Sequence, residues 1–189
     1  MKSPQFTANP PERCYHCKHI RFTGLMQLAR EQGYQYVLDG ANADDIYDYR
    51  PGQQAARELG VRSPLEEVGL TKAEIRQLSR ELGLWTWNKP SAACLASRIP
   101  YGTTITPEKL KQIEQAEEVL YQLGFKELRV RHHGEIARLE VPLGDFPRIT
   151  EEQCLKRVVT ELKALGFTYV TLDLQGLRSG SMNEALKSN

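Results

Sequence analysis

Cys94 is the residue in this chain whose surroundings most suggest reactivity. It lies in a stretch of small residues, with Lys89 before it and Arg98 after it. Both cations could stabilise a thiolate, which is the form of cysteine that attacks carbon or binds a metal. The competing interpretation is a turn of small residues around a half-buried cysteine, and local composition favours neither.

Cys14 and Cys17 form a Cys-x-x-Cys pair at the start of an expected helix. Such a pair can be half of a zinc site, a redox pair, part of an iron–sulfur site, or a coincidence. If the loop around Cys94 folds back, three thiolates could ligate a [4Fe–4S] cluster and leave one iron open for chemistry. Cys154 lies within another expected helix, where we expect it to pack as a small hydrophobe.

A polar loop over residues 39–45 follows an apolar run that is typical of a buried parallel strand. Open α/β sheets bind their ligands at the carboxyl ends of such strands. Asn42 could bind a base or ribose, and Asp44 or Asp45 could hold Mg²⁺ beside a triphosphate. An ordinary acidic turn would have the same composition, and for this loop alone it is the better interpretation.

Arg129 and Arg131 are two residues apart on an expected strand, so their side chains should share one face of a sheet. Arg138 and Glu140 form a similar pair on the next expected strand. Guanidinium groups side by side suit a phosphate or a carboxylate. A cross-strand ladder of salt bridges would explain the pattern equally well.

The elements that must position these groups change in character near residue 103. Before it, the pattern predicts the second half of an α/β layer on a parallel sheet. Its expected elements are a helix over 17–32, a strand over 35–39 and helices over 51–60 and 71–82. Pro90 and Pro100 exclude a continuous helix through the loop of residues 88–102, which we call the cysteine loop.

After residue 103, the pattern predicts a compact α+β domain. Its expected elements are a helix over 106–123, a hairpin of 128–133 with 136–141, a helix over 150–166 and a strand over 169–174. The sequence therefore predicts a first domain over residues 1–103 and a second, substrate or oligomerisation domain over 104–189.

Composition excludes several classes of protein. The net charge of +1 gives no general case for binding nucleic acid. No apolar run is long enough to span a bilayer, and no signal segment opens the chain, so we expect a cytoplasmic protein without a membrane partner. Four cysteines are too few for a disulfide scaffold.

Taken together, the motifs resemble the LarE family of ATP-dependent sulfur transferases, within the PP-loop ATP pyrophosphatase superfamily. The resemblance runs from about Asn9 to Glu184. It rests on Cys14-Tyr-His-Cys-Lys18, Asp39-Gly-Ala-Asn-Ala-Asp-Asp45, Lys89-Pro-Ser-Ala-Ala-Cys-Leu-Ala-Ser-Arg98, Arg129-Val-Arg131 and Asp173-Leu-Gln-Gly-Leu-Arg-Ser-Gly-Ser181. The cysteine loop and the final Gly-Leu-Arg-Ser-Gly-Ser are its most specific parts.

The resemblance implies sulfur insertion during biosynthesis of the nickel-pincer nucleotide cofactor. Family members adenylate a carboxylate of pyridinium-3,5-dicarboxylate mononucleotide and then replace its oxygen with sulfur. In one branch a single cysteine gives up its own sulfur. In the other, three cysteines hold a [4Fe–4S] cluster that carries an extra sulfide, and Cys14, Cys17 and Cys94 match this branch. The implied cofactors are ATP, Mg²⁺ and the cluster. The implied partners are the mononucleotide, a sulfide or other sulfur donor, and further copies of the chain in a homo-oligomer.

The resemblance also assigns site residues. Those implied to line the substrate-phosphate and sulfur-transfer site are Ser97, Arg98, Arg129, Arg131 and Glu140, with Cys94 as the catalytic residue. Asp145 is a weaker candidate for a metal ligand nearby.

One departure from the family pattern concerns the loop that cradles ATP phosphates. The family's Ser-Gly-Gly-x-Asp-Ser loop is missing, because no two glycines are adjacent in this sequence. We therefore expect an incomplete PP-loop domain, of the adenine nucleotide alpha hydrolase-like fold, that does not hydrolyse ATP alone. Two alternatives are a cysteine-ligated metal module and another PP-loop enzyme, such as a tRNA thiolase or an amidotransferase-like synthetase. The balanced charge counts against a tRNA substrate.

Overall fold

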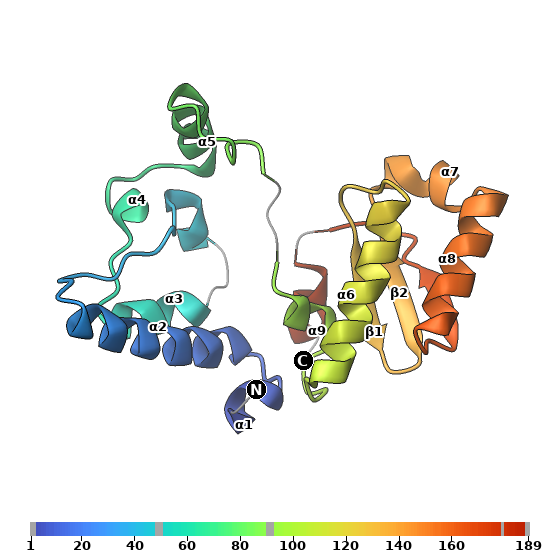
Figure 1. The fold of residues 1–189 in the computed structure, drawn as a ribbon, viewed down its shortest axis with the longest axis horizontal. Coiled ribbons are helices and arrows are strands. Elements are labelled where there is room, and N and C mark those ends of the chain that lie inside the picture. The colour runs from blue at the N-terminus through green and yellow to red at the C-terminus, as the bar shows by residue number, and fades with distance from the viewer. Residues whose placement is uncertain (1–2, 48–50, 90–92, 179, 188–189) are drawn as a thin grey trace. The chain divides into compact units, whose positions relative to one another are not determined.

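A computed structural model of the chain describes residues 3–47, 51–89, 93–178 and 180–187 (Figure 1). The chain divides into two compact units. Residues 10–91 form one, which we call the helical unit, and residues 1–9 with 92–189 form the other, which we call the sheet unit. The domain boundary predicted at residue 103 stays a prediction.

The helical unit is built from helices around a small core. Its elements are α2 (Arg13–Glu31), η1 (Ala43–Tyr47), α3 (Pro51–Glu58), α4 (Pro64–Glu67) and α5 (Lys72–Glu81). Phe22, Ala56 and Val61 form the buried core cluster. The predicted strand over 35–39 is reduced to an isolated parallel bridge between Leu38 and Arg62. It is closed by hydrogen bonds of 2.9 Å from the Asp39 N–H to the Arg62 carbonyl and 3.0 Å from the Arg62 N–H to the Val37 carbonyl.

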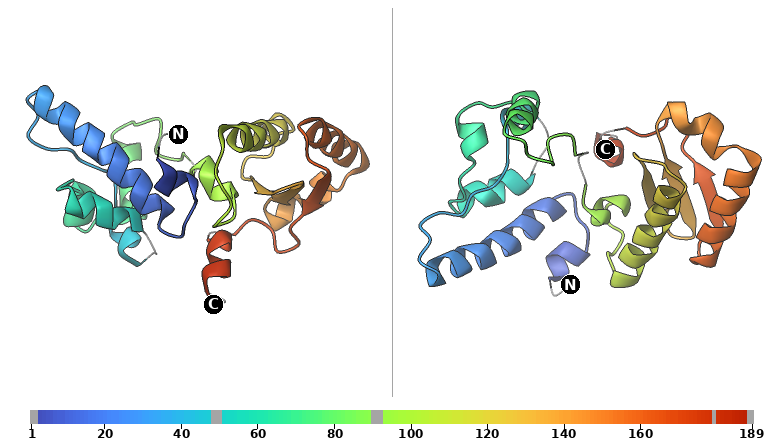
Figure 2. Two further views of the ribbon diagram at one scale, coloured as in Figure 1. Left: turned by 90° about the horizontal axis from the view of Figure 1, so that it is seen from below. Right: turned by 45° about the horizontal axis from the view of Figure 1, so that its top comes forward.

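The sheet unit contains a three-stranded mixed sheet in the order β1-β2-β3. The strands are β1 (Arg129–His133), β2 (Ile136–Glu140) and β3 (Tyr169–Leu172). β1 and β2 are antiparallel, as the predicted hairpin requires, and β3 runs parallel to β2. The main helices are α6 (Pro107–Gln122) and α8 (Glu152–Ala164), and Figure 2 shows them on one side of the sheet. The shorter elements are α1 (Pro4–Thr7), η2 (Leu95–Arg98), η3 (Leu143–Asp145), α7 (Phe146–Ile149), η4 (Ser181–Asn183) and α9 (Glu184–Lys187).

The side of the sheet under α6 and α8 carries the largest core of the described residues. Val130, Ala137 and Leu139 point from the strands into a buried cluster that includes Leu120 of α6 and Leu162 of α8. Because side chains alternate along a strand, the residues between these positions must face the other side of the sheet. The core therefore fixes which residues form the opposite, polar face.

Asn9 holds the end of the cysteine loop within the sheet unit. Its buried side-chain amide donates hydrogen bonds to the carbonyl groups of Ile99 at 3.2 Å, Pro100 at 2.7 Å and Thr103 at 3.0 Å. The backbone carbonyl of Asn9 accepts a hydrogen bond from the Gly102 N–H at 2.8 Å. Asn9 adopts a left-handed φ of 57°, a conformation that asparagine tolerates better than most residues. The Asn9 side chain thus fixes the backbone at the C-terminal end of the cysteine loop, which contains Cys94.

Two helix starts differ from those expected. α2 begins at Arg13, four residues before the predicted start, so Cys14 and Cys17 lie inside its first turns. Pro10 and Pro11 lack the N–H groups that a helix interior needs, so the helix cannot extend back through them. No proline lies between Pro11 and Cys17, so the helix can begin directly after the prolines. α8 begins at Glu152 because the Glu151 carboxylate accepts hydrogen bonds from the N–H groups of residues 153 and 154. The capping box predicted at the start of α5 and the N-cap of α6 at Thr106 are both confirmed.

The described ranges also bear on membrane association. Within them, no helix combines the length and apolar character that crossing a bilayer requires.

Candidate functional site

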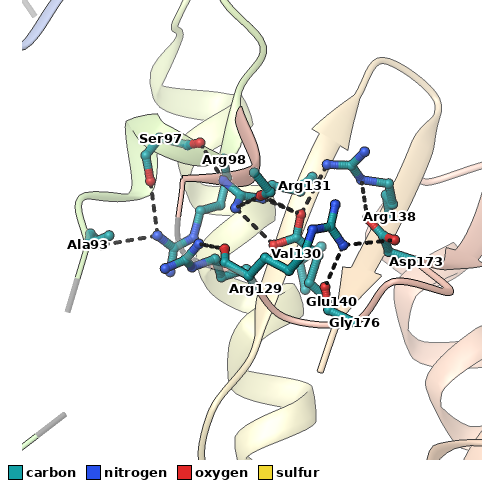
Figure 3. Close-up of polar contacts among 12 residues, drawn as sticks. Ala93, Ser97, Arg98, Arg129, Val130, Arg131, Arg138, Glu140, Asp173 and Gly176 are labelled. Carbon is teal, nitrogen blue, oxygen red and sulfur yellow. Dashed lines mark hydrogen bonds and ion pairs between the residues drawn. The ribbon is translucent and has the colours of Figure 1, made fainter. Parts of the chain in front are cut away.

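The polar face of the β1–β2 hairpin gathers the arginines that the sequence singled out. The register pairs Arg129 with Glu140 and Arg131 with Arg138. All four side chains therefore project from the face opposite the core, as the alternation predicted. Figure 3 shows these four residues together with the segment that ends at Arg98.

Arg131 and Glu140 form a fully buried ion pair at the centre of this face. The Nε and Nη2 atoms of Arg131 each lie 2.9 Å from a carboxylate oxygen of Glu140 (Figure 3). The remaining donors of Arg131 reach the Ser97 carbonyl and the Ser181 hydroxyl, both at 2.8 Å. The side chains are 2% and 0% exposed. This is the cross-strand salt bridge that the sequence allowed, and the role of both residues in substrate binding stays a prediction.

A second buried pair joins the cysteine loop to α6. Arg98 donates from Nε and Nη2 to the two carboxylate oxygens of Glu117, at 2.8 and 3.2 Å. Its Nη1 atom donates to the Ala93 carbonyl at 3.2 Å and the Ser97 hydroxyl at 3.1 Å. Among the described residues, no hydrogen bond joins Arg98 to the sulfur of Cys94. Arg98 thus holds the backbone beside the cysteine. Stabilisation of the Cys94 thiolate by its charge stays a prediction.

Glu117 is the site residue that the sequence reasoning missed. Besides holding Arg98, it accepts a hydrogen bond of 3.0 Å from the Val130 N–H of β1. A signal was present, because Glu117 falls on the same helix stripe as Ile113, Ala116 and Leu120, all of which are buried. A carboxylate in an apolar stripe needs a buried partner.

Arg129 differs from its neighbours in its charge partners. No carboxylate of the described residues lies within ion-pair distance of its guanidinium, whereas Arg98, Arg131, Arg138 and Arg178 each have one. Its one described hydrogen bond is donated to the Arg178 carbonyl at 2.9 Å. Burial, followed by the charges of Arg131 and Arg98, lowers the pKa of Arg129. Glu140 and Glu117 act on its charge without a direct ion pair, so Arg129 keeps spare donors, which suits an anion.

The segment after β3 closes over the same face. The Asp173 carboxylate lies 3.7 Å from Nε of Arg138 and 3.6 Å from Nη1 of Arg178. The Ser181 hydroxyl donates to Glu140 at 3.1 Å. Asp173 and Ser181 thus hold the segment of residues 173–181, which contains the Gly-Leu-Arg-Ser-Gly-Ser motif, to the hairpin at its two ends. Ser179 of the motif lies outside the described residues.

Cys94 sits at the edge of this network with an exposed thiol. It precedes η2, and its carbonyl accepts from the Ser97 N–H at 2.8 Å. Two hydrogen bonds fix the η2 turn: Arg98 donates to the Ala93 carbonyl, and Arg131 donates to the Ser97 carbonyl. An exposed thiol on a fixed turn can act as a nucleophile, a sulfur donor or a metal ligand. Residues 90–92 lie outside the described part of the chain. The prediction that Pro90 interrupts a helix there therefore stays a prediction.

Cys14 and Cys17 belong to the helical unit. They lie three residues apart on α2 and so share one side of that helix, with Cys14 exposed and Cys17 half-buried. Thiolates are the donors that iron–sulfur clusters take, so the donor type fits. No three His, Cys, Asp or Glu side chains are grouped for a metal within the described residues. The three-cysteine cluster therefore stays a prediction.

The predicted ATP and Mg²⁺ loop is ordered by its own hydrogen bonds. The Asp45 carboxylate accepts from the N–H and side-chain amide of Asn42, both at 3.1 Å. Asp44 accepts from the Lys72 N–H at 2.9 Å, at the start of α5. These contacts are those of the ordinary acidic turn, and a role in ATP binding stays a prediction.

A cavity of about 460 Å³ lies beside this loop in the helical unit. Asp39 lies in the wall of this cavity. Burial by itself would raise the pKa of its carboxyl group. Hydrogen bonds from Ser63 and Ala41 and the charge of Lys18 outweigh that effect, so the net pKa is lowered. The lining includes Lys18, Arg21, Phe22, Leu38, Asp39 and Asp45. Mixed apolar and charged walls of this kind can accept a nucleotide-sized ligand.

Asp145, the weaker metal candidate, closes η3 in the sheet unit. It lies at the N-terminus of α7, where its side chain makes no capping hydrogen bond. Nothing within the described ranges groups it with other metal-binding side chains, so its role stays a prediction.

Comparison with known proteins gives three related sequences. No family model matches the chain. It is 47% identical over 186 residues to the uncharacterised protein slr1717 of Synechocystis and 32% identical over 179 residues to the uncharacterised protein MJ0830 of Methanocaldococcus jannaschii. It is 44% identical over 181 residues to pyridinium-3,5-bisthiocarboxylic acid mononucleotide synthase of Lactiplantibacillus plantarum. The matches cover 98%, 95% and 94% of this chain, but 69%, 69% and 64% of those proteins. The chain thus spans about two thirds of the length of the curated relatives it matches.

Proposed function

The chain belongs to the LarE-like family, and from that premise we propose that it acts in ATP-dependent sulfur transfer during nickel-pincer nucleotide biosynthesis. In the proposed reaction, sulfur replaces a carboxylate oxygen of an adenylated pyridinium-3,5-dicarboxylate mononucleotide. One observation carries the proposal: the chain is 44% identical, over 94% of its length, to a synthase of a pyridinium bisthiocarboxylic acid mononucleotide.

The proposed reaction has two steps, adenylation and sulfur transfer. The substrate carboxylate attacks the α-phosphorus of ATP, and pyrophosphate leaves to give an acyl-adenylate. A sulfur nucleophile then attacks the acyl carbon, the bond to the bridging oxygen breaks, and AMP departs with that oxygen. The carbon keeps the sulfur as a thiocarboxylate. We assign ATP and Mg²⁺ to the PP-loop part of the protein, with Asn42, Asp44 and Asp45 as ligands. Asp145 of the sheet unit is a weaker Mg²⁺ candidate, near the proposed sulfur-transfer site.

The polar face of the sheet unit supports a role in holding the mononucleotide. Arg129 would bind the phosphate, because it is the half-buried arginine without an acidic partner in the described part of this face. Arg131 with Glu140, and Arg98 with Glu117, would form the rigid base beneath it. Ser97 links the two pairs, since its carbonyl binds Arg131 and its hydroxyl binds Arg98.

Cys94 is the proposed residue at the point of transfer. In the sacrificial route, its thiolate forms a thioester with the acyl carbon. Loss of the Cα proton and cleavage of the Cβ–Sγ bond would then leave dehydroalanine on the chain. In the cluster route, Cys14, Cys17 and Cys94 hold a [4Fe–4S] cluster that supplies sulfide when bound. We favour the cluster, because the sacrificial route gives Cys14 and Cys17 no task.

Iron counting tests this assignment independently of turnover. After anaerobic reconstitution with iron and sulfide, we expect about four irons per wild-type chain and a marked loss in Cys14→Ala, Cys17→Ala and Cys94→Ala. Cys154→Ala is the matched control, because Cys154 packs against the core of the sheet unit. Full iron content in Cys94→Ala, or a chain lighter by H₂S after turnover, would assign the protein to the sacrificial route.

The activity itself is tested with ATP, Mg²⁺, sulfide and the dicarboxylate mononucleotide under anaerobic conditions, in a protein of the relatives' full length that carries this sequence. Mass spectrometry should find a thiocarboxylate product that depends on ATP and on Cys94. A product that forms equally in Cys94→Ala would refute the role of this residue. We propose that the protein is cytoplasmic, forms a homo-oligomer and does not bind nucleic acid.

A further inference from the structure

The two tryptophans of the chain lie in one turn that follows α5 in the helical unit. Trp85 is 81% exposed and Trp87 is 38% exposed. Leu82 and Leu84 beside them are also exposed. A tryptophan ring is ordinarily buried over most of its surface, so the aromatic surface displayed by this turn is unusual and is accessible to a ligand.

Backbone hydrogen bonds hold this turn in place. The N–H of Leu84 donates to the Ser79 carbonyl at 2.8 Å, which ends α5, and Gly83 takes the left-handed φ of 69° that this ending requires. The N–H of Trp87 donates to the Leu84 carbonyl at 3.1 Å, and that of Lys89 to Thr86 at 3.0 Å. The backbone around Trp85 is therefore ordered, and its ring is presented to solvent by a defined turn.

Each indole already carries a cation over its face. Nζ of Lys89 lies 5.8 Å from the ring centroid of Trp85, and Cζ of Arg80 lies 5.0 Å from that of Trp87. These distances are in the range of cation–π attraction, for which tryptophan is the best side chain. Trp87 is the more enclosed ring and its cation belongs to the adjacent helix. Trp85 is the more open ring, and its cation is on a flexible lysine stem.

We propose that the face of Trp85 binds the cationic pyridinium ring of the substrate, with Lys89 displaced from the ring to meet a ring carboxylate. The identity of the ligand rests on the proposed function. A pyridinium dicarboxylate combines a positive ring with negative substituents, and the Trp85 turn offers the complementary arrangement of a π face beside an ammonium group. An uncharged ring would lose the electrostatic part of this attraction. Trp85 would thus favour a pyridinium ring over a neutral one of the same shape.

Tryptophan fluorescence tests the proposal directly, because these two residues are the chain's whole complement of tryptophan. In the Trp87→Phe variant of the full chain, Trp85 is the sole indole. Titration with N-methylpyridinium-3,5-dicarboxylate should quench it saturably, while benzene-1,3-dicarboxylate, which lacks the ring charge, should bind more weakly. Quenching that stays linear in probe concentration, or equal affinity for the two probes, would overturn the proposal.

Calorimetry with the same pyridinium probe separates the two rings. We expect Trp85→Ala to weaken binding by about five- to tenfold and Trp85→Phe by less, since phenylalanine keeps a weaker π face. Trp87→Phe should leave the affinity unchanged. Because the Trp85 side chain is exposed, thermal melting should not shift in either Trp85 variant.

These experiments distinguish a failure of the Trp85 contact from a failure of the proposed sulfur-transfer function. If the probe binds at Trp85 as described but the full reaction yields no thiocarboxylate, the sulfur-transfer proposal fails and the pyridinium contact stands. If thiocarboxylate forms with the same KM in wild type and Trp85→Ala, the contact fails and the function stands.

Discussion

The helical unit and the sheet unit use the same kinds of residues in different ways. In the sheet unit, charged side chains are buried in pairs, and a large apolar cluster lies on the opposite side of the sheet. In the helical unit, the core cluster is small, and its described ion pairs lie near the surface. Large apolar side chains such as Leu38, Val68 and Leu82 are exposed there. The contrast lies in the charges: the sheet unit buries them in hydrogen-bonded pairs, whereas those of the helical unit's described ion pairs stay near the surface.

The largest effect should follow from breaking the central buried pair. We expect Glu140→Gln to destabilise the protein by about 3–5 kcal/mol, because Arg131 would keep a buried charge without a carboxylate. Urea unfolding monitored by circular dichroism measures the change. The double change Arg131→Met with Glu140→Leu should recover much of the loss, since well-packed apolar residues often replace such pairs. A double variant no more stable than Glu140→Gln would mean that the pair is not the source of the effect.

The next effect concerns ligand binding. If Arg129 binds a phosphate, Arg129→Ala should weaken binding of nicotinic acid mononucleotide by about 1.5–3 kcal/mol, the scale of a charged hydrogen bond. The same change should leave binding of the nucleoside, which lacks the phosphate, nearly unchanged. Arg157→Ala on the exposed side of α8 is the matched control. A large loss of stability with unaltered phosphate dependence would instead assign Arg129 to the fold.

A third prediction concerns the pH dependence that the buried His132 gives to the sheet unit. His132 of β1 is 4% exposed, and burial, with the charge of Lys109, lowers its pKa in the folded state. The unfolded chain therefore binds the proton more readily, and stability should fall as pH drops below the ordinary histidine value of about 6.5. Urea unfolding of His132→Gln between about pH 7 and 5 should show a shallower loss than wild type. Equal slopes in wild type and His132→Gln would contradict this account.

The sequence predicted much of the sheet unit because its signals are local. The alternation of residues 128–141 indicated both the hairpin and the shared face of Arg129 and Arg131, and the register confirms both. Thr106 and the capping box at Thr71 marked two helix starts correctly. These features depend on side chains within a few residues of each other, which is the range over which a single sequence is informative.

The partners of the buried charges could not be read in the same way. Arg98 was predicted as a cation that could stabilise the Cys94 thiolate, but its buried partner Glu117, nineteen residues away on α6, was not predicted. Arg131 was placed on the correct face, yet its bonds to Ser97 and Ser181 depend on segments that meet only in the folded unit. Such choices follow from the need to satisfy every buried donor, and that need becomes visible only when the packing is known.

The smallest effect should come from the surface counterpart of the central pair. Arg57 and Glu66 of the helical unit approach to 3.0 Å, close to the 2.9 Å between Arg131 and Glu140. The Arg57 side chain is 66% exposed, so water solvates its charge in both the folded and the unfolded chain. We therefore expect Arg57→Ala to change stability by only about 0–1 kcal/mol, and added salt to reduce even that. Urea unfolding at low and high salt measures both effects, beside Glu140→Gln under the same conditions. Because the two distances are nearly equal, a loss in Arg57→Ala as large as that in Glu140→Gln would show that burial does not set the strength of these pairs.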